Sequence, residues 1–148
     1  MSIIIEACSR EDLPDIDKLW REAFADDQPR HRADVVVPAK LAFQPDLFLV
    51  ARDEGRVVGS VMAGYDGHRG WINRVAVSKT HRGQGLGTSL MQEAEARLRA
   101  LGCVKINLQV RTGNRAVIDF YRDLGYDVEE RISMSKLTAQ SLDSEKAS

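Results

Sequence analysis

The sequence predicts an α/β (α+β) fold, namely a mixed, mostly antiparallel sheet of about six to seven strands with about four helices packed on it. Strand-like segments at 47–52, 56–65 and 71–78 are joined by glycine-containing turns, which is typical of an antiparallel meander. From Gly85 to Leu101 apolar residues then recur with the period of a helix. The two patterns together indicate a sheet followed by a helix that packs against it.

The first 46 residues supply one strand and one clear helix. Ile3–Cys8 is a short run rich in β-branched residues, which predicts a first strand. Ser9 is suited to cap the following helix, whose apolar residues recur at helical spacing to about Phe24. Between residues 26 and 46 three prolines allow at most a short helix, around Ala39–Phe43.

Beyond the long helix the pattern alternates again. Residues 104–110 alternate apolar and polar side chains, which predicts a strand with one polar face. Asn114 begins a short helix, and two brief strands follow at about 126–129 and 132–137. We expect a single domain at 1–148, with a folded core at 1–137 and a polar tail at 138–148.

Composition excludes several classes of protein. A chain of 148 residues with a net charge of −1 lacks the basic bias of a whole-domain nucleic-acid binder, so we expect no nucleic-acid partner. No apolar stretch approaches the roughly 20 residues of a membrane span, so we expect no membrane partner. The three histidines show no ligand spacing to one another or to the cysteines, and we expect no metal.

The two cysteines indicate a reducing environment. Cys8 and Cys103 lie in apolar stretches without CxxC or metal-ligand spacing, so we interpret them as buried thiols. The N-terminal apolar run is too short for a signal peptide and is followed by acidic residues. We therefore expect a cytoplasmic protein.

The segment RGQGLGTS, residues 82–89, is the strongest functional signal. Glycines at 83, 85 and 87 fall on a strand-to-helix turn and the first helical turn, where unpaired backbone N–H groups and the helix dipole favour an anion. Arg82 adds a positive charge. The segment lacks the lysine of an ATP-binding P-loop, and it does not follow the first strand of a dinucleotide fold. It is either a ligand-free turn or a site for a phosphate-bearing cofactor other than ATP or NAD.

This segment resembles a motif of the GNAT N-acetyltransferase superfamily. VAVSKTHRGQGLGTSLMQ, at 75–92, is similar to its motif A, with Arg82, Gly85 and Gly87 at the (R/Q)-x-x-G-x-(G/A) positions. NRAVIDFYRDLGY, at 114–126, resembles the family's later signature, and the match covers roughly residues 45–137. GYDGHRG, at 64–70, resembles the YpeA-like bacterial acetyltransferases. The resemblance implies a splay between the fourth and fifth strands.

The resemblance implies that acetyl-CoA is the cosubstrate. Its pyrophosphate would bind the amides of Gln84–Thr88, and its pantetheine arm would lie between strands 74–78 and 106–110. An N–H at Val75 would polarise the thioester carbonyl, which makes it a catalytic group. The implied cofactor-binding residues are Val75, Ala76, Val77, Arg82, Gly83, Gln84, Gly85, Leu86, Gly87, Thr88, Asn114 and Tyr121.

Two residues of the later signature have alternative interpretations. Tyr121 matches the tyrosine that the family uses as a general acid, which would protonate the departing CoA thiolate. Alternatively, it packs on its helix for buried area alone. Asn114 matches a cofactor contact, and it is equally an ordinary helix N-cap.

The general base is where the sequence departs from the family. Asn73 and Gln109 stand where relatives carry glutamate, and an amide cannot usefully accept a proton at neutral pH. A water chain, Asp66 or His68 could serve as base, or the amine could arrive deprotonated; Asp66 and His68 are equally consistent with hairpin turn chemistry. Trp71 could line the acceptor pocket or pack on the sheet.

The sequence therefore predicts an acetyl-CoA-dependent N-acetyltransferase that transfers the acetyl group directly to a primary amine in a ternary complex. The alternative is a non-catalytic acyl-CoA-binding sensor or interaction module, and a weaker one is a nucleotide-phosphate binder outside the family. The acceptor is a small-molecule or peptide amine. The resemblance also implies a possible homodimer.

Overall fold

The computed structural model describes residues 2–139 and divides into two compact units. The first ends at Leu108, and the second begins at Gln109. The first unit holds the sheet with its three long helices, and the second holds one shorter helix. The mixed α/β architecture confirms the predicted fold class, and the four α-helices among the described residues agree with the predicted number.

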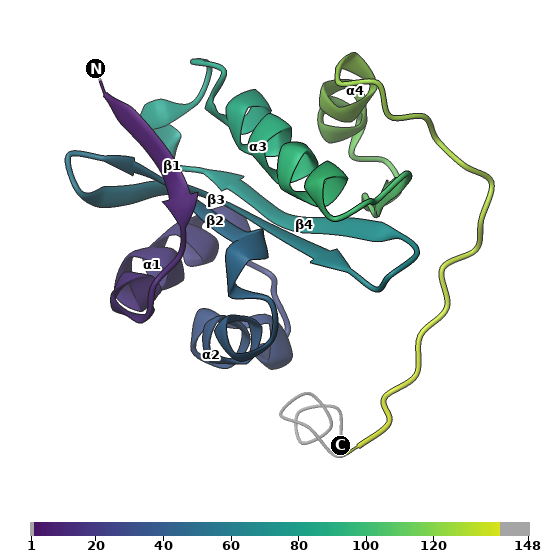
Figure 1. Ribbon diagram of the computed structural model, residues 1–148, viewed down its shortest axis with the longest axis horizontal. Helices are drawn as coiled ribbons and strands as arrows, with labels where there is room; N and C mark the ends of the chain where they lie inside the picture. Colours follow the sequence, from purple (N-terminus) through teal and green to yellow (C-terminus); the bar gives the residue numbers. More distant parts are fainter. Residues whose placement is uncertain (1, 140–148) are drawn as a thin grey trace. The chain divides into compact units, whose positions relative to one another are not determined.

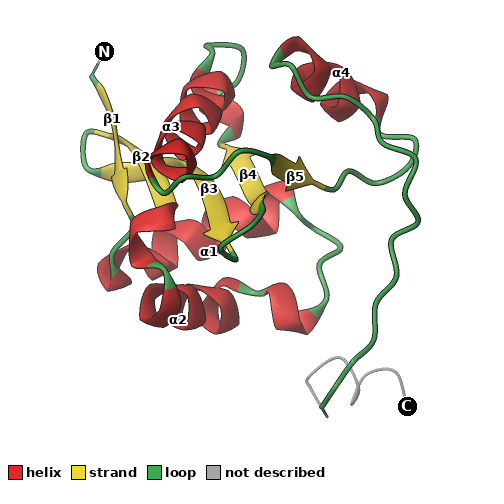
Figure 2. Cartoon of the chain, turned by 45° about the vertical axis from the view of Figure 1, so that its right-hand side comes forward, coloured by secondary structure: helices red, strands yellow, loops and turns green. Residues whose placement is uncertain are grey.

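The first unit is built on a five-stranded mixed sheet in which strand order follows sequence order. The first three pairings are antiparallel, and β4 pairs with β5 in parallel (Figure 2). The meander predicted from the glycine turns is therefore confirmed. The strands are β1 (Ile3–Ala7), β2 (Phe48–Asp53), β3 (Arg56–Tyr65), β4 (Gly70–Val77) and β5 (Ile106–Leu108).

Three helices cover the two faces of this sheet: α1 (Leu13–Ala23), α2 (Ala33–Phe43) and α3 (Leu86–Ala100). The α1 and α2 helices lie on one face and α3 on the other (Figure 1). Neighbouring residues of β3 face helices on opposite sides of the sheet, because successive side chains of a strand alternate between the two faces. Ser60 accepts a hydrogen bond from Trp20 of α1, whereas a Cβ at Gly59 would lie 2.9 Å from Leu90 of α3.

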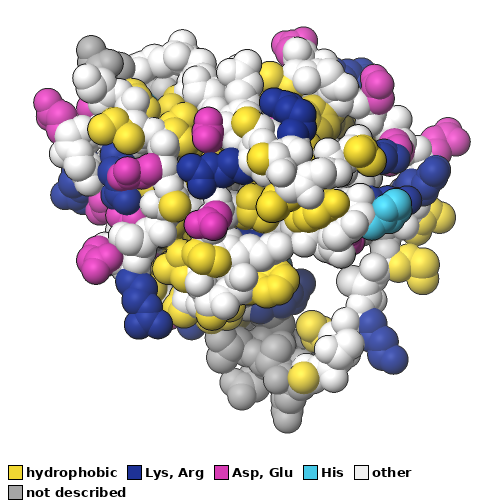
Figure 3. Space-filling model, viewed as in Figure 1, with side chains coloured by type: hydrophobic (Ala, Val, Ile, Leu, Met, Phe, Trp, Pro, Cys, Tyr) yellow, Lys and Arg dark blue, Asp and Glu magenta, His cyan; other side chains and the backbone are white. Residues whose placement is uncertain are grey.

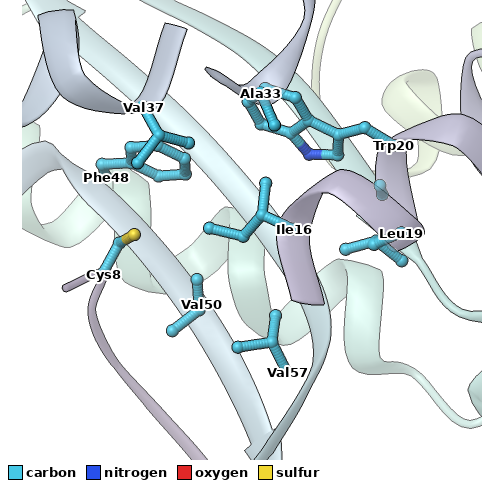
Figure 4. Packing of buried hydrophobic residues seen from close by; sticks show 10 residues of the cluster. Cys8, Ile16, Leu19, Trp20, Ala33, Val37, Phe48, Val50 and Val57 are labelled. Atoms are coloured by element: carbon cyan, nitrogen blue, oxygen red, sulfur yellow. The ribbon is translucent and has the colours of Figure 1, made fainter. Parts of the chain in front are cut away.

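The core between the sheet and α1 and α2 is a cluster of buried apolar side chains (Figure 4). Trp20 stacks on Phe48 with ring centroids 6.0 Å apart, so a helix residue and a strand residue share the centre of this layer. Cys8 belongs to the same cluster, and Cys103 is buried too; both are free thiols, as predicted.

The α2 helix is longer than the sequence predicts, since it begins at Ala33 rather than near Ala39. Pro38 lies inside it and lacks the N–H that would bond to the carbonyl of Asp34, so one helical hydrogen bond is missing. Ala33 and Val37, one turn apart, are each 1% exposed in the core. Burial of this face outweighs the local preference of the proline.

The second unit contains α4 (Arg115–Asp123). Asn114 caps it as predicted, with its Oδ1 accepting the N–H of Val117 at 3.4 Å. The two strands predicted at 126–129 and 132–137 are absent, so the predicted six to seven strands become five. Ile132 and Met134 are each 89% exposed, so no layer covers them. An alternating pattern forms a strand only where a partner edge and a covering layer are available.

Part of the predicted polar tail, residues 140–148, lies outside the described residues. Over residues 2–139, no helix is both long and apolar enough to cross a membrane. Lysine and arginine side chains are interspersed with aspartate and glutamate on the face in Figure 3, as the near-zero net charge leads one to expect.

Candidate functional site

The glycine turn, residues 82–85, lies between β4 and α3, as the sequence predicts. After a 3₁₀ turn at Lys79–His81 the chain passes through Gly83 and Gly85, whose φ angles of 76° and 79° lie in the left-handed region that favours glycine. Leu86 is buried and fixes the start of α3 on the sheet. Gly83, Gln84 and Gly85 remain exposed.

The start of α3 presents unpaired backbone donors. The first hydrogen bond of this helix runs from the N–H of Ser89 to the carbonyl of Gly85, at 3.1 Å. The amides of Leu86, Gly87 and Thr88 precede this bond, so the helix itself gives them no acceptor. Together with the positive end of the helix dipole, they can bind a phosphate group.

Gly87 is not explained by backbone conformation. It lies in the first turn of α3, and its φ is not positive. Glycine within a helix costs roughly 0.5–1 kcal/mol relative to alanine, so the fold alone would favour a side chain here. A glycine that the backbone does not need is consistent with close approach of a ligand to the helix N-terminus.

Side chains anchor the loop that leads into this turn. The ring of His81 lies between Asp53, with Nε2 2.8 Å from Oδ2, and Thr80, with Nδ1 2.8 Å from Oγ1. Glu22 of α1 accepts the N–H of Lys79 at 2.8 Å. Arg82 is exposed and donates from Nε to the carbonyl of Val77 at 3.1 Å. The loop is therefore held at both the β2 and the α1 side.

The edge of β4 beyond Ile72 has no strand partner toward β5. The parallel pairing covers three positions and ends at Ile72 and Leu108, whereas β4 continues to Val77. Within the first unit, the main-chain groups of residues 73–77 on this side therefore do not pair with β5. An extended ligand can add to such an edge as a further strand.

A β-bulge interrupts β4 at the same point. Ser60 pairs with Ala76 and Met62 with Asn73, so that Arg74 and Val75 together oppose the single residue between them on β3. Arg74 has a φ of 54°, which is unusual for a residue other than glycine. The sequence gives no signal for this bulge, because the glycine that commonly marks one is absent.

The predicted acceptor-side residues of β4 share one face of the sheet. Trp71 pairs with Gly64 and Asn73 with Met62, on the face that α1 and α2 cover. Trp71 is 42% exposed, so it is not part of the buried core. Asn73 is exposed as well. Both side chains can therefore contact a ligand on this face.

Of the two candidate bases at the β3–β4 turn, Asp66 stabilises that turn through its side chain. Oδ1 of Asp66 accepts the N–H groups of Arg69 and His68, at 2.7 and 2.8 Å. These hydrogen bonds, that from Arg69 foremost, lower the pKa of Asp66 and make it a weaker base. From Gly70 to Val75 the strand runs roughly 15 Å, which separates this turn from the bulge.

Three predicted residues belong to the second unit. Tyr121 lies on α4, where its ring makes edge contacts with Phe120 and Tyr126 at centroid distances of 5.1 and 5.9 Å. Burial raises the pKa of Tyr121, so the hydroxyl keeps its proton at neutral pH. Gln109 is exposed and donates from Nε2 to Ser133 Oγ at 2.8 Å, while Asn114 caps α4.

No group of three or more His, Cys, Asp or Glu side chains within residues 2–139 is arranged to hold a metal ion. Burial raises the pKa of the Cys8 thiol to about 12, with a smaller contribution from Asp12. Cys8 therefore carries no thiolate at neutral pH and is a poor nucleophile.

Comparison with known proteins adds evidence of kinship. Residues 13–126 match the model of the acetyltransferase (GNAT) family. A protein of Sodalis glossinidius named acetyltransferase is 39% identical over 128 residues, which cover 86% of this chain and 89% of that protein. At this identity and coverage the two chains share a family.

Solved structures show the same fold. Ard1 from Thermoplasma volcanium has a TM-score of 0.79 at 22% identity, covering 87% of this chain and 85% of its own. The PaiA N-acetyltransferase from Thermoplasma acidophilum, in complex with coenzyme A, has a TM-score of 0.77 at 21% identity, with 89% and 94% covered.

Proposed function

Because the chain belongs to the acetyltransferase (GNAT) family and is a GNAT-type N-acetyltransferase, we propose that it transfers an acetyl group from acetyl-CoA directly to a primary amine. The acceptor is a small-molecule or peptide amine. The observation that carries the proposal is the start of α3, where the amides of Leu86–Thr88 lie outside the helical ladder and Gly87 bears no side chain although its backbone would accept one.

Acetyl-CoA fits this part of the chain on two grounds. Unpaired amides at a helix N-terminus suit its pyrophosphate, and Arg82 beside them adds positive charge. The unpaired edge of β4 at 73–77 suits the amide-bearing pantetheine arm, with main-chain groups of Val75 and Val77 as its partners. The coenzyme A in the PaiA structure supports the same choice of cosubstrate.

In the proposed reaction acetyl-CoA supplies the thioester. The amine nitrogen forms a bond to the acetyl carbon, the carbon–sulfur bond breaks, and the main-chain N–H of Val75 stabilises the negative charge on the acetyl oxygen. Tyr121, which stays protonated, gives its proton to the departing sulfur. The amine loses one proton to water or to solution, since Asn73 and Gln109 are amides. The high pKa of Cys8 agrees with direct transfer.

Several wider expectations belong to the same proposal. We propose one acetyltransferase domain at 1–148, because the family match at 13–126 includes residues of both units. The YpeA-like subgroup and a homodimer stay predictions from resemblance. The two free buried cysteines agree with a reducing compartment such as the cytoplasm.

The proposal is tested by release of free CoA thiol from acetyl-CoA with a panel of primary amines. The wild-type protein is compared with Tyr121→Phe and with the matched control Tyr126→Phe, whose ring contacts that of Tyr121. We expect amine-dependent thiol release that falls about a hundredfold in Tyr121→Phe and little in the control. Binding of acetyl-CoA without thiol release for any amine would instead favour the acyl-CoA-binding sensor.

A further inference from the structure

The bulge residue Arg74 adopts a conformation that its surroundings must hold in place. Its φ of 54° brings Cβ close to the following carbonyl oxygen, a strain that glycine would not have. Arg74 and Val75 are the two residues that oppose one residue of β3, so the conformation of Arg74 directly sets the orientation of the Val75 main chain.

The main chain of Arg74 is held from β3 and α1. Ser60 Oγ donates to the carbonyl of Arg74 at 2.8 Å, and Trp20 Nε1 donates to Ser60 Oγ at 2.9 Å. Ser60 is fully buried and Trp20 is 3% exposed, so water does not compete for these bonds. This chain of hydrogen bonds fixes the carbonyl of the bulge.

The side chain of Arg74 is held from α1 and the segment after it. Nη1 donates to Asp27 Oδ2 at 2.6 Å, and the guanidinium carbon lies 4.6 Å from the ring centroid of Phe24 and 5.1 Å from that of Trp20. The Arg74 side chain is only 10% exposed, so solvent screens the ion pair little. We call these contacts of Asp27, Phe24 and Trp20 with Arg74 the arginine clamp.

We propose that Arg74 is a positioning residue for acetyl transfer, and that the arginine clamp stabilises the left-handed bulge that aims the main chain of Val75 at the acetyl thioester. This inference rests on the proposed function. Arg74 itself touches no reacting atom. Its clamp offsets the strain of the left-handed conformation and ties β4 to the segment that follows α1.

Substitution by alanine and by glycine separates this role from simple packing. Both variants remove the clamp, but Arg74→Gly adopts the left-handed conformation without strain, whereas Arg74→Ala does not. We expect Arg74→Ala to lower kcat tenfold or more and Arg74→Gly to keep a kcat at least fivefold above it. The KM for acetyl-CoA should stay within threefold in both, since the proposed pyrophosphate site lies at the start of α3 rather than at the bulge.

A second pair of variants tests Asp27 with Arg74 retained. Asp27→Ala should lower kcat in the same direction as Arg74→Ala, because the arginine keeps its strain and loses its ion pair. In an Arg74→Gly background, Asp27→Ala should change kcat less than twofold. Equal kcat in Arg74→Gly and Arg74→Ala, or a lower kcat in the glycine variant, would overturn the proposal, because that is what lost packing alone produces.

NMR coupling constants that report the φ of residue 74 give a readout independent of turnover. We expect a positive φ in the wild-type protein and in Arg74→Gly, and a population with negative φ in Asp27→Ala. A uniformly positive φ in Asp27→Ala would overturn the role of the clamp. If the wild-type protein releases no CoA thiol with any amine, the proposed function fails, and this measurement alone decides whether the clamp holds the bulge.

Discussion

His81 Nε2 lies 2.8 Å from Asp53 Oδ2, and this contact joins the loop before the glycine turn to the end of β2. The other ring nitrogen contacts the hydroxyls of Thr80 and Ser78, at 2.8 and 3.1 Å. One imidazole thus connects a strand of the sheet to the residue before the 3₁₀ turn and to the middle residue of that turn, which leads to Arg82. The position of the proposed pyrophosphate site therefore depends on a residue that needs no contact with the ligand.

Replacing His81 by alanine should weaken acetyl-CoA binding. The loop loses its hydrogen bonds to Asp53 and the two hydroxyls, so we expect the Kd for acetyl-CoA to rise about threefold to tenfold, as for a loss of roughly 1 kcal/mol. Isothermal titration calorimetry measures the change. His68→Ala, at the exposed β3–β4 turn, is the matched control, and an equal effect in both variants would refute the role of His81.

Two glycines of β3 differ in the space around them, which predicts different costs of alanine at the two positions. A Cβ at Gly59 would lie 2.9 Å from Leu90 Cδ1 and 3.2 Å from the carbonyl of Ala76, whereas at Gly64 the nearest atom is 3.5 Å away. We expect Gly59→Ala to lower the free energy of unfolding by about 1–3 kcal/mol, with little loss for Gly64→Ala. Urea unfolding compares them, and equal stability of the two variants would contradict this packing.

The buried ion pair between Asp12 and Arg52 predicts a loss of stability in acid. Burial alone would raise the pKa of Asp12, but hydrogen bonds from Arg52, at 2.6 and 2.8 Å, and from the Ser9 amide leave it below its ordinary value. A lowered folded-state pKa means that the stabilisation is complete above the unfolded pKa of about 3.9. It is lost as pH falls through the folded-state value.

Replacing Asp12 by asparagine tests this ion pair. The variant leaves Arg52 without its main partner, so we expect a loss of about 3 kcal/mol at pH 7 and a smaller dependence of stability on pH below 4. Asp17→Asn removes an exposed pair with Arg21 and should cost less than about 1 kcal/mol. An equal cost for both substitutions in urea unfolding at pH 7 would show that burial adds nothing.

The raised pKa of Tyr121 predicts how acetyl transfer depends on pH. Because burial raises this pKa above its ordinary value near 10, the hydroxyl stays protonated through neutral and mildly basic pH. We expect thiol release to increase with pH as the acceptor amine deprotonates, with no loss that depends on Tyr121 below pH of about 10. A decline between pH 8 and 9.5 that is absent in Tyr121→Phe would contradict this.

The sequence predicts those parts of the fold that local patterns determine. The glycine turns of the meander, the helical period after Gly85 and the cap at Asn114 each act over a few residues, and the structure has them. The length of α2 depends on burial of Ala33 and Val37 in a core that the prolines do not reveal. The strands expected at 126–137 depend on partners, which alternation cannot supply.

The same division holds for the candidate site. Sequence identifies the glycine turn, because left-handed φ values and free helix amides follow from residue type and position. It misses the bulge at Arg74, since the contacts with Ser60 and Asp27 that hold it come from residues 14 and 47 positions away. It also leaves Asp66 as a possible base, where the structure shows its oxygen occupied by backbone N–H groups.

Gly87→Ala should separate ligand binding from folding. The φ of Gly87 is not positive, so its backbone suits alanine, and we expect the free energy of unfolding to rise by about 0.5–1 kcal/mol, while the added methyl group weakens acetyl-CoA binding. Thermal unfolding without ligand measures the first effect and calorimetric titration the second. Lower stability together with unchanged affinity would mean that this glycine serves the fold alone.

The most direct test of the central claim is the thermal stabilisation of the protein by acetyl-CoA. At a ligand concentration of 100 times Kd, binding adds about 2.7 kcal/mol, which corresponds to roughly 8 °C in Tm for a chain of this size. We expect this shift with acetyl-CoA but not with ATP or NADH, its loss in Gly87→Glu, and its retention in Gln92→Glu, which places the same charge farther along α3. An equal shift in both variants, or no shift at saturating acetyl-CoA, would contradict a pyrophosphate site at the start of α3.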